Sequence, residues 1–163
     1  MKLIKIGKIV NTHGIKGEIR LLSKFPYKDK VFVKDMTIYI DRKDKEIINT
    51  YRRHKNFDMI TLRGYTNINE VLKYKGKNVY VDTEDINLDK DKYLDEELIG
   101  LNVIYEGVNK GTISDIERYD KTVLFVIKND NKEYLIPYND NIIDKIDINN
   151  KVIYIKDIKG LFE

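Results

Sequence analysis

The chain has 163 residues and a mass of 19.3 kDa, enough for one ordinary domain or two small ones, and this excludes a large multidomain enzyme. Its 30 basic and 27 acidic residues give a net charge of +3. The charge is unevenly divided, because residues 1–84 hold 19 Lys and Arg against 10 Asp and Glu, net +9, whereas residues 85–163 hold 11 against 17, net −6. Two regions of opposite charge indicate two surfaces that meet different partners.

The composition favours β structure, and the lack of cysteine suits a protein of a reducing compartment. The chain lacks Ala, the best helix former, and is rich in β-branched and aromatic residues that suit strands. It also lacks Cys, which excludes disulfides, thiolate metal sites and cysteine nucleophiles. No apolar run approaches the roughly 18 residues of a membrane span, and the first residues do not form a signal peptide. We therefore expect a cytoplasmic protein without a membrane partner.

The basic region shows short strands separated by turns. The predicted strands are Lys2–Val10, Glu18–Leu22, Met36–Ile40, Glu46–His54, Met59–Leu62 and Val79–Val81. A turn-rich loop, Asn11–Gly17, separates the first two. One short helix is predicted to begin at Asn67, with Glu70 in the position of a partial capping box, and to end at Gly76. This pattern is typical of a small barrel with a helix at one end.

The acidic region repeats the pattern after a break. Residues 85–92 are polar and poor in apolar side chains, which is typical of an interdomain linker. Beyond them, strands are predicted at Asn102–Tyr105, Gly111–Glu117, Thr122–Ile127, Glu133–Pro137 and Lys151–Ile155, with hairpin turns at Asn109–Gly111 and Asn129–Asn131. The sequence thus predicts two domains, a basic one at residues 1–84 and an acidic one at residues 93–163.

Residues able to carry catalysis are few. The two histidines, His13 and His54, lack the Ser/His/Asp grouping or metal-ligand spacing that would make them catalytic or metal-binding. No phosphate-binding loop of the nucleotide-hydrolysing type is present, and the Asp residues lack calcium-loop spacing. We expect no catalytic residue, metal or cofactor. An RNA-processing enzyme that uses His13 and His54 as acid and base remains the third alternative.

Two segments are candidates for binding phosphate. In Gly14-Ile15-Lys16-Gly17 the glycines permit close backbone approach, and Lys16 and Arg20 are placed to reach a phosphate. The predicted flanking strands exclude the helix-flanked Gly-x-x-Gly loop of KH domains, and a purely structural β-turn is an equal alternative.

The second segment, Tyr51-Arg52-Arg53-His54-Lys55, is the densest basic cluster. Strand alternation predicts Tyr51, Arg53 and Lys55 on one face and Arg52 and His54 on the other. Guanidinium groups match phosphate in a two-pronged geometry, although a solvated strand face that binds nothing is an equal alternative.

The segment Gly7-Lys8-Ile9-Val10-Asn11-Thr12-His13-Gly14-Ile15-Lys16-Gly17-Glu18-Ile19-Arg20 closely resembles the opening signature of the RimM family of ribosome maturation factors. Later landmarks resemble the family in the same order. They are Asn67-Ile68-Asn69-Glu70-Val71-Leu72 with Gly76-Lys77, Glu97-Leu98-Ile99-Gly100-Leu101, Leu135-Ile136-Pro137 and Gly160-Leu161.

The resemblance implies a fold of two small β-barrels: a six-stranded N-terminal barrel similar to those of translation factors and a C-terminal PRC-type barrel. It also implies a non-catalytic factor that binds a small-subunit head ribosomal protein, number nineteen, and assists late small-subunit assembly and 16S rRNA processing. Nothing in the sequence demands more than a monomer, which is the expected state. The alternative is a general RNA-binding β-barrel protein without a dedicated protein partner. With the basic cluster, the expected RNA-binding residues are His13, Gly14, Lys16, Gly17, Arg20, Arg52, Arg53 and Lys55.

The expected ribosomal-protein interface lies at the start of the second domain. The family commonly has adjacent aromatics there, whereas this chain has Tyr93 followed by Leu94. Tyr93 offers an aromatic anchor, and Leu94 offers apolar area without stacking or a hydroxyl. The expected interface residues are Tyr93, Leu94, Leu98 and Ile99.

Overall fold

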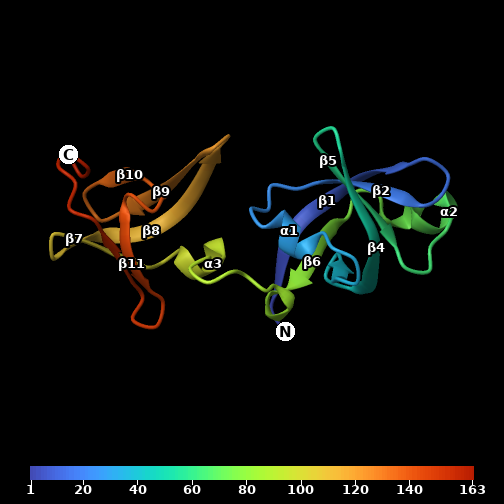
Figure 1. Cartoon of the computed structure of the whole chain (residues 1–163), viewed down its shortest axis with the longest axis horizontal. Coiled ribbons are helices and arrows are strands. Elements are labelled where there is room, and N and C mark those ends of the chain that lie inside the picture. The colour runs from blue at the N-terminus through green and yellow to red at the C-terminus, as the bar shows by residue number, and fades with distance from the viewer. The chain divides into compact units, whose positions relative to one another are not determined.

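The computed structural model describes residues 1–163 as two compact units, Met1–Lys90 and Asp91–Glu163. Figure 1 shows that each unit has its own β-structure. The expectation of a mainly β protein with two β units, the first of them a six-stranded barrel, is confirmed. No helix in either unit is long and apolar enough to cross a lipid bilayer.

The first unit is a closed barrel with the strand order β1-β2-β5-β4-β3-β6. Its strands are β1 (Leu3–His13), β2 (Glu18–Leu22), β3 (Thr37–Ile40), β4 (Asp44–His54), β5 (Phe57–Leu62) and β6 (Asn78–Asp82). All six predicted strands of this region are confirmed. Apolar side chains at alternate positions fill the interior and are almost completely buried: Ile6, Ile9, Ile19, Leu21, Ile38, Ile40, Ile48, Ile60, Leu62, Val79 and Val81.

Two long strands close the barrel, because each pairs with a different neighbour at each end. The 11-residue β1 pairs with β6 through Leu3–Lys8 and with β2 through Lys8–His13. The 11-residue β4 pairs with β3 and then with β5, and its register shifts between Ile48 and Thr50. Such bulges bend a strand and increase its twist, as a small closed barrel requires.

The strand β1 is longer than the sequence predicts. Asn11, Thr12 and His13 were expected in a loop, but they pair with Arg20, Ile19 and Glu18 of β2. A register shift between Ile9 and Asn11 absorbs the irregularity and lets the pairing continue. The true turn is therefore confined to residues 14–17.

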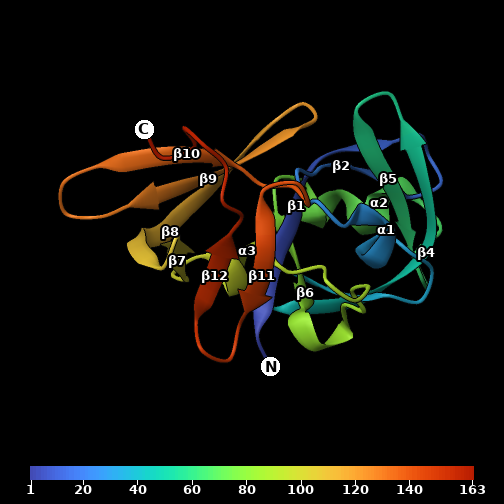
Figure 2. The same ribbon diagram turned by 60° about the vertical axis from the view of Figure 1, so that its left-hand side comes forward.

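The predicted helix is confirmed as α2 (Ile68–Val71) followed by the 3₁₀ turn η1 (Leu72–Tyr74). The Glu70 carboxylate accepts hydrogen bonds from the backbone N–H groups of Thr66, at 2.9 Å, and Asn67, at 3.1 Å, as a capping box does. The helix lies beside β1 and β2, as Figures 1 and 2 show. Two short elements were missed here, α1 (Lys28–Val31) and the 3₁₀ turn η2 (Thr83–Asp85).

The segment predicted as a linker, residues 85–92, is divided by the boundary between the units at Lys90 and Asp91. Ile86 is buried, and Asp89 accepts a hydrogen bond from Lys30 Nζ at 3.2 Å. The first part of the segment therefore belongs to the first unit.

The second unit is a six-stranded sheet in the order β10-β9-β8-β7-β12-β11. Its elements are α3 (Asp95–Leu98), β7 (Asn102–Tyr105), β8 (Val108–Tyr119), β9 (Thr122–Lys128), β10 (Glu133–Pro137), β11 (Ile143–Asp147) and β12 (Val152–Ile155). The five predicted strands are confirmed, whereas β11 and α3 were missed. The core includes Leu98, Val103, Phe125, Ile136 and Ile153.

One predicted hairpin turn of the second unit is confirmed and the other is wrong. The Asn129 side chain accepts from the backbone N–H groups of Asn131 and Lys132, both at 2.9 Å, and forms the turn between β9 and β10. Residues 109–111 instead lie within β8. The turn before β8 consists of Glu106 and Gly107, whose φ angles of 51° and 75° match the type I′ geometry that two-residue hairpins favour.

Candidate nucleic-acid interface

Four adjacent barrel strands bring basic and imidazole side chains to one outer face. Residues directly opposite each other in antiparallel strands lie on the same face. His13 of β1 pairs with Glu18 of β2, and Met59 of β5 pairs with both Arg20 of β2 and Arg52 of β4. His54 pairs with Phe57 by the same rule. We name this group the outer cluster: His13, Glu18, Arg20, Arg52, His54 and Phe57.

Arg20 is held between a histidine and an aromatic ring. One terminal nitrogen of its guanidinium lies 2.8 Å from His13 Nδ1, and its Cζ lies 4.9 Å from the centroid of the Phe57 ring. An arginine can only donate, so His13 Nδ1 accepts and the imidazole carries its proton on Nε2. The Arg20 Nε has no hydrogen-bond partner, but it is buried, so only the terminal nitrogens of this guanidinium can donate to a ligand.

The two histidines form a close pair in this cluster. The ring centroids of His13 and His54 are 5.5 Å apart. Loss of hydration and the neighbouring charge of Arg52 lower the pKa of His54 from its usual 6.5, so this imidazole is neutral at pH 7. The positive charge of the outer cluster at neutral pH therefore comes from the two arginines.

Arg52 makes a two-pronged contact with Glu18. Its Nε and a terminal nitrogen donate to the two carboxylate oxygens at 2.8 and 2.7 Å. The hydrogen bond from Arg52 outweighs burial and lowers the pKa of Glu18 from 4.5. The Arg52 side chain is 48% exposed, whereas that of Glu18 is 17% exposed, so the guanidinium remains accessible above the carboxylate.

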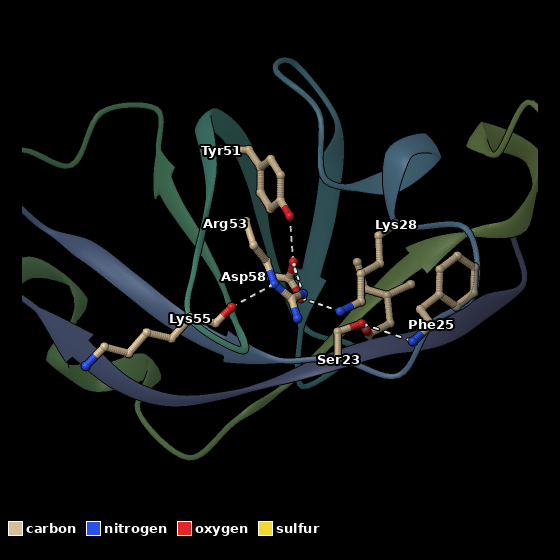
Figure 3. Close-up of polar contacts among 8 residues, drawn as sticks. Ser23, Phe25, Lys28, Tyr51, Arg53, Lys55 and Asp58 are labelled. Atoms are coloured by element: carbon tan, nitrogen blue, oxygen red, sulfur yellow. Dashed lines mark hydrogen bonds and ion pairs between the residues drawn. The ribbon is translucent and has the colours of Figure 1, made fainter. Parts of the chain in front are cut away.

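Arg53 points to the opposite side of β4, as alternation predicts. Figure 3 shows Arg53, Tyr51 and Lys28 converging on Asp58, the one buried charged residue of the chain. Its carboxylate accepts from Lys28 Nζ at 2.8 Å, from the Tyr51 hydroxyl at 2.6 Å and from Arg53 at 3.1 Å. The network links α1 to β4 and β5, so Arg53 has a structural role in addition to its exposed surface.

Lys55 does not share the strand face of Tyr51 and Arg53. The strand β4 ends at His54, and Lys55 adopts a positive φ of 56° in the following turn. Its carbonyl accepts a hydrogen bond from Arg53 Nε at 3.2 Å. Strand alternation does not apply beyond the end of a strand, and this part of the predicted face is wrong.

The two glycines of the predicted phosphate loop have different surroundings. Gly14 has a φ of +69°, and a Cβ there would meet nothing within 4 Å. Gly17 is buried with a φ of +90°, and its Cβ would lie 3.2 Å from the Asn67 carbonyl oxygen. The Ile15 carbonyl accepts from the Ile68 N–H at 2.9 Å. Gly17 thus seats the turn against the start of α2, while Lys16 is exposed.

The expected interface residues of the second unit also differ from one another. Leu98 is completely buried in the core and Leu94 is 7% exposed, so neither side chain offers surface to a partner. Tyr93 packs against the core and is half-buried, and Ile99 is 44% exposed. The sequence indicates an apolar segment here, but the side chains of Leu94, just before α3, and of Leu98, within α3, both point into the core.

Three members of the outer cluster, Glu18, His54 and Phe57, lie outside the RNA-binding residues that the sequence predicts. Strand alternation predicts that His54 shares a face with Arg52, and this signal was sufficient to include His54. Glu18 and Phe57 gave no local signal, because their places depend on how β2, β4 and β5 pair across the barrel.

The fold and the outer cluster define the class of protein. It is a β protein of two units, in which a barrel rich in basic residues is followed by a sheet in a region rich in acidic residues. The RimM N-terminal domain family matches residues 4–86, and the RimM PRC barrel domain family matches residues 95–161. The chain belongs to the RimM family.

Two relatives that match over nearly their whole length agree with this assignment. The ribosome maturation factor RimM of Exiguobacterium sp. is 36% identical over 100% of this chain and 98% of its own length. That of Bacillus mycoides is 38% identical over 98% of both chains. A crystal structure of a Pseudomonas aeruginosa 16S ribosomal RNA processing protein RimM has 23% identity and a TM-score of 0.46, and it covers 98% of this chain and 99% of its own.

Proposed function

We propose that the protein is a ribosome maturation factor that assists late assembly of the small ribosomal subunit and 16S rRNA processing, without catalysis, as a cytoplasmic monomer. Its relatives of full length are named ribosome maturation factors. The single observation that supports an RNA partner is the outer cluster, where Arg20 and Arg52 present guanidinium groups on one strand face. Guanidinium groups bind phosphate through paired hydrogen bonds.

The RNA-binding surface in this proposal consists of the outer cluster and its neighbours. His13, Arg20, Arg52 and the exposed Lys16 and Lys55 contact phosphate. Arg53 is partly exposed on the other side of β4, where it also donates to Asp58, so a phosphate that it contacts lies apart from the outer cluster. Gly14 permits close approach of the turn, and Gly17 acts indirectly by holding that turn against α2. The ring of Phe57 packs against the Arg20 guanidinium and helps to hold it in place.

The acidic second unit is the proposed site for a ribosomal protein, number nineteen of the small subunit. Residues 85–163 carry 17 acidic against 11 basic residues, and complementary charge speeds the encounter with a cationic partner. Tyr93 and Ile99 supply apolar contact, because Leu94 and Leu98 are buried. The factor would hold the protein and nearby RNA in the state that assembles, by binding that state more tightly than its competitors.

Capture from a ribosome-containing lysate by the full-length protein tests the proposal. We expect recovery of small-subunit precursors together with one head protein, and that protein remains bound after ribonuclease treatment. If it is lost with the RNA, the protein is instead a general RNA-binding barrel. That alternative is favoured by the burial of Leu94 and Leu98, which leaves a small apolar surface for a protein partner.

Substitution tests the RNA surface separately. Arg52→Ala weakens binding of single-stranded RNA and flattens its salt dependence, because each phosphate contact contributes about 0.7 to the slope of log K against log salt concentration. Arg42→Ala is the matched control, since Arg42 lies over the Tyr80 ring in the turn before β4, outside the outer cluster. Equal effects of the two substitutions would place the RNA surface elsewhere.

A further inference from the structure

The contact between Arg52 and Glu18 has the geometry of a phosphate contact. Two guanidinium nitrogens donate to two oxygens of one anionic group at 2.8 and 2.7 Å, and this two-pronged arrangement is the one that arginine uses with phosphate. A carboxylate therefore already occupies the donors that a phosphate would take.

We propose that Glu18 is an internal competitor for phosphate at Arg52, so that RNA binds there only by exchanging a carboxylate for a phosphate on the same guanidinium. This inference rests on the proposed RNA-binding function of the outer cluster. It assigns to Glu18 a role in setting affinity, one that opposes binding, whereas the surrounding residues promote it.

The exposure of the two partners permits this exchange. The Arg52 side chain is 48% exposed and that of Glu18 is 17% exposed, so a ligand can approach Arg52 from solvent before it displaces the carboxylate. Ion pairs with an exposed partner contribute little to stability, because water and salt screen them. Separation of this pair is therefore a small obstacle for a ligand that makes further contacts.

The charges around the pair explain why the competition matters. Arg20 and Arg52 supply two positive charges and Glu18 removes one, while His13 accepts from Arg20 through Nδ1 and His54 has a lowered pKa. The pKa of Glu18 is also lowered, chiefly by its hydrogen bond from Arg52, so the carboxylate stays charged at neutral pH. An isolated anion faces this reduced charge, whereas an RNA strand that also contacts Arg20 and Lys16 gains enough to displace Glu18.

Glu18→Gln tests the inference, because it removes the charge and keeps the shape. The probe is a short fluorescein-labelled single-stranded RNA of mixed sequence, measured by anisotropy with the full-length protein. We expect about 2- to 5-fold tighter binding at low ionic strength, because the phosphate no longer has to displace a partly exposed ion pair, whose contribution is of that order, and a steeper salt dependence. Glu84→Gln is the matched control, since Glu84 is an exposed glutamate of the same unit outside the cluster.

A double substitution separates competition from a general charge effect. In an Arg52→Ala background, most of the gain from Glu18→Gln disappears if the two groups compete for one donor pair. A gain of equal size in both backgrounds, or no gain at all in a variant with an unchanged thermal unfolding curve, overturns the inference. Glu18→Ala provides the second variant and is expected to change affinity in the same direction.

The proposed function fails in a different way. If neither Arg52→Ala nor Arg20→Ala weakens RNA binding, the outer cluster is not an RNA-binding surface, and the proposed role of Glu18 is refuted as well. If Arg52→Ala weakens binding and Glu18→Gln does not strengthen it, the surface stands and only the competition is refuted.

Discussion

Replacement of the buried carboxylate Asp58 by Asn should destabilise the first unit. The side chain of Asp58 is completely buried and accepts from Lys28, Tyr51 and Arg53. Asn has nearly the same shape, but its neutral amide loses both ion pairs and presents an NH₂ group to donors. Breaking a buried ion pair costs about 3–5 kcal/mol when the remaining charge stays buried.

The expected loss lies below that range because of where the remaining charges are. The side chains of Lys28 and Arg53 are 27% and 48% exposed, so both can turn toward water. We expect Asp58→Asn to lower the free energy of unfolding by about 2–3 kcal/mol, roughly the net value of one hydrogen bond to a charged group. Urea unfolding followed by circular dichroism measures it, with the wild-type protein under the same conditions as the reference.

The difference between wild type and Asp58→Asn should depend on pH with a defined sign. Burial raises the pKa of Asp58, but hydrogen bonds from Lys28 and Tyr51 outweigh it and bring the pKa below 3.8. A lowered folded-state pKa gives stability that is present above the unfolded-state value and is lost as the pH falls through the folded-state value. The difference is therefore full at neutral pH and shrinks in acid.

The control for this prediction is Asp35→Asn. Asp35 forms an ion pair with Arg63, but the two side chains are 65% and 52% exposed, and the free energy of unfolding should change by less than about 0.5 kcal/mol. The reasoning would be refuted if Asp58→Asn unfolded at the same urea concentration as the wild type at pH 7. It would also be refuted if the difference in free energy of unfolding between the two proteins widened as the pH fell.

Three further predictions concern the same unit. Gly17→Ala should destabilise the barrel by about 1–2 kcal/mol in the same urea assay, because of the positive φ and the close Asn67 carbonyl, and Gly14→Ala should cost less, because its Cβ meets open space. Tyr74→Phe should cost about 1 kcal/mol, since the buried Tyr74 hydroxyl donates to Glu46, which keeps a second hydrogen bond from Tyr65. The double substitution His13→Asn with His54→Asn should weaken RNA binding, because His13 is a proposed phosphate contact, but should leave rRNA cleavage intact in a cell-free assembly assay at saturating protein. Loss of cleavage with RNA binding retained would instead indicate acid–base catalysis.

Most strands could be predicted from local patterns, because alternation of apolar and polar residues reports directly which face is buried. The strand β11 was missed because Ile142 and Ile143 are adjacent and interrupt alternation, and Asn and Asp residues precede it. The helices α1 and α3 have four residues each, too few to show a helical repeat. The helix α2 is equally short, but the capping pattern of Asn67 and Glu70 and the stop at Gly76 marked it independently of any repeat. Element type was thus predictable wherever the pattern was long enough to establish a period.

The candidate site was only partly predictable, for a physical reason. Alternation correctly separates Arg52 from Arg53, since both lie within one strand. The meeting of Arg52 with Glu18, 34 positions apart in the chain, depends on the pairing of β2 and β4 with β5. Register between distant strands is set by the whole barrel, so no local segment of the sequence contains it.

The bent strand β4 has a consequence for how this face tolerates change. Its irregularity between Ile48 and Thr50 fixes which of the two neighbouring arginines faces outward. Insertion or deletion of one residue at that point would turn every following side chain over. Arg53 would then stand opposite Glu18, and Arg52 would face Asp58. The bulge therefore sets which face of the barrel each following side chain of β4 occupies. The chemistry of this surface depends on the number of residues that precede Arg52 in β4 as well as on the identity of those residues.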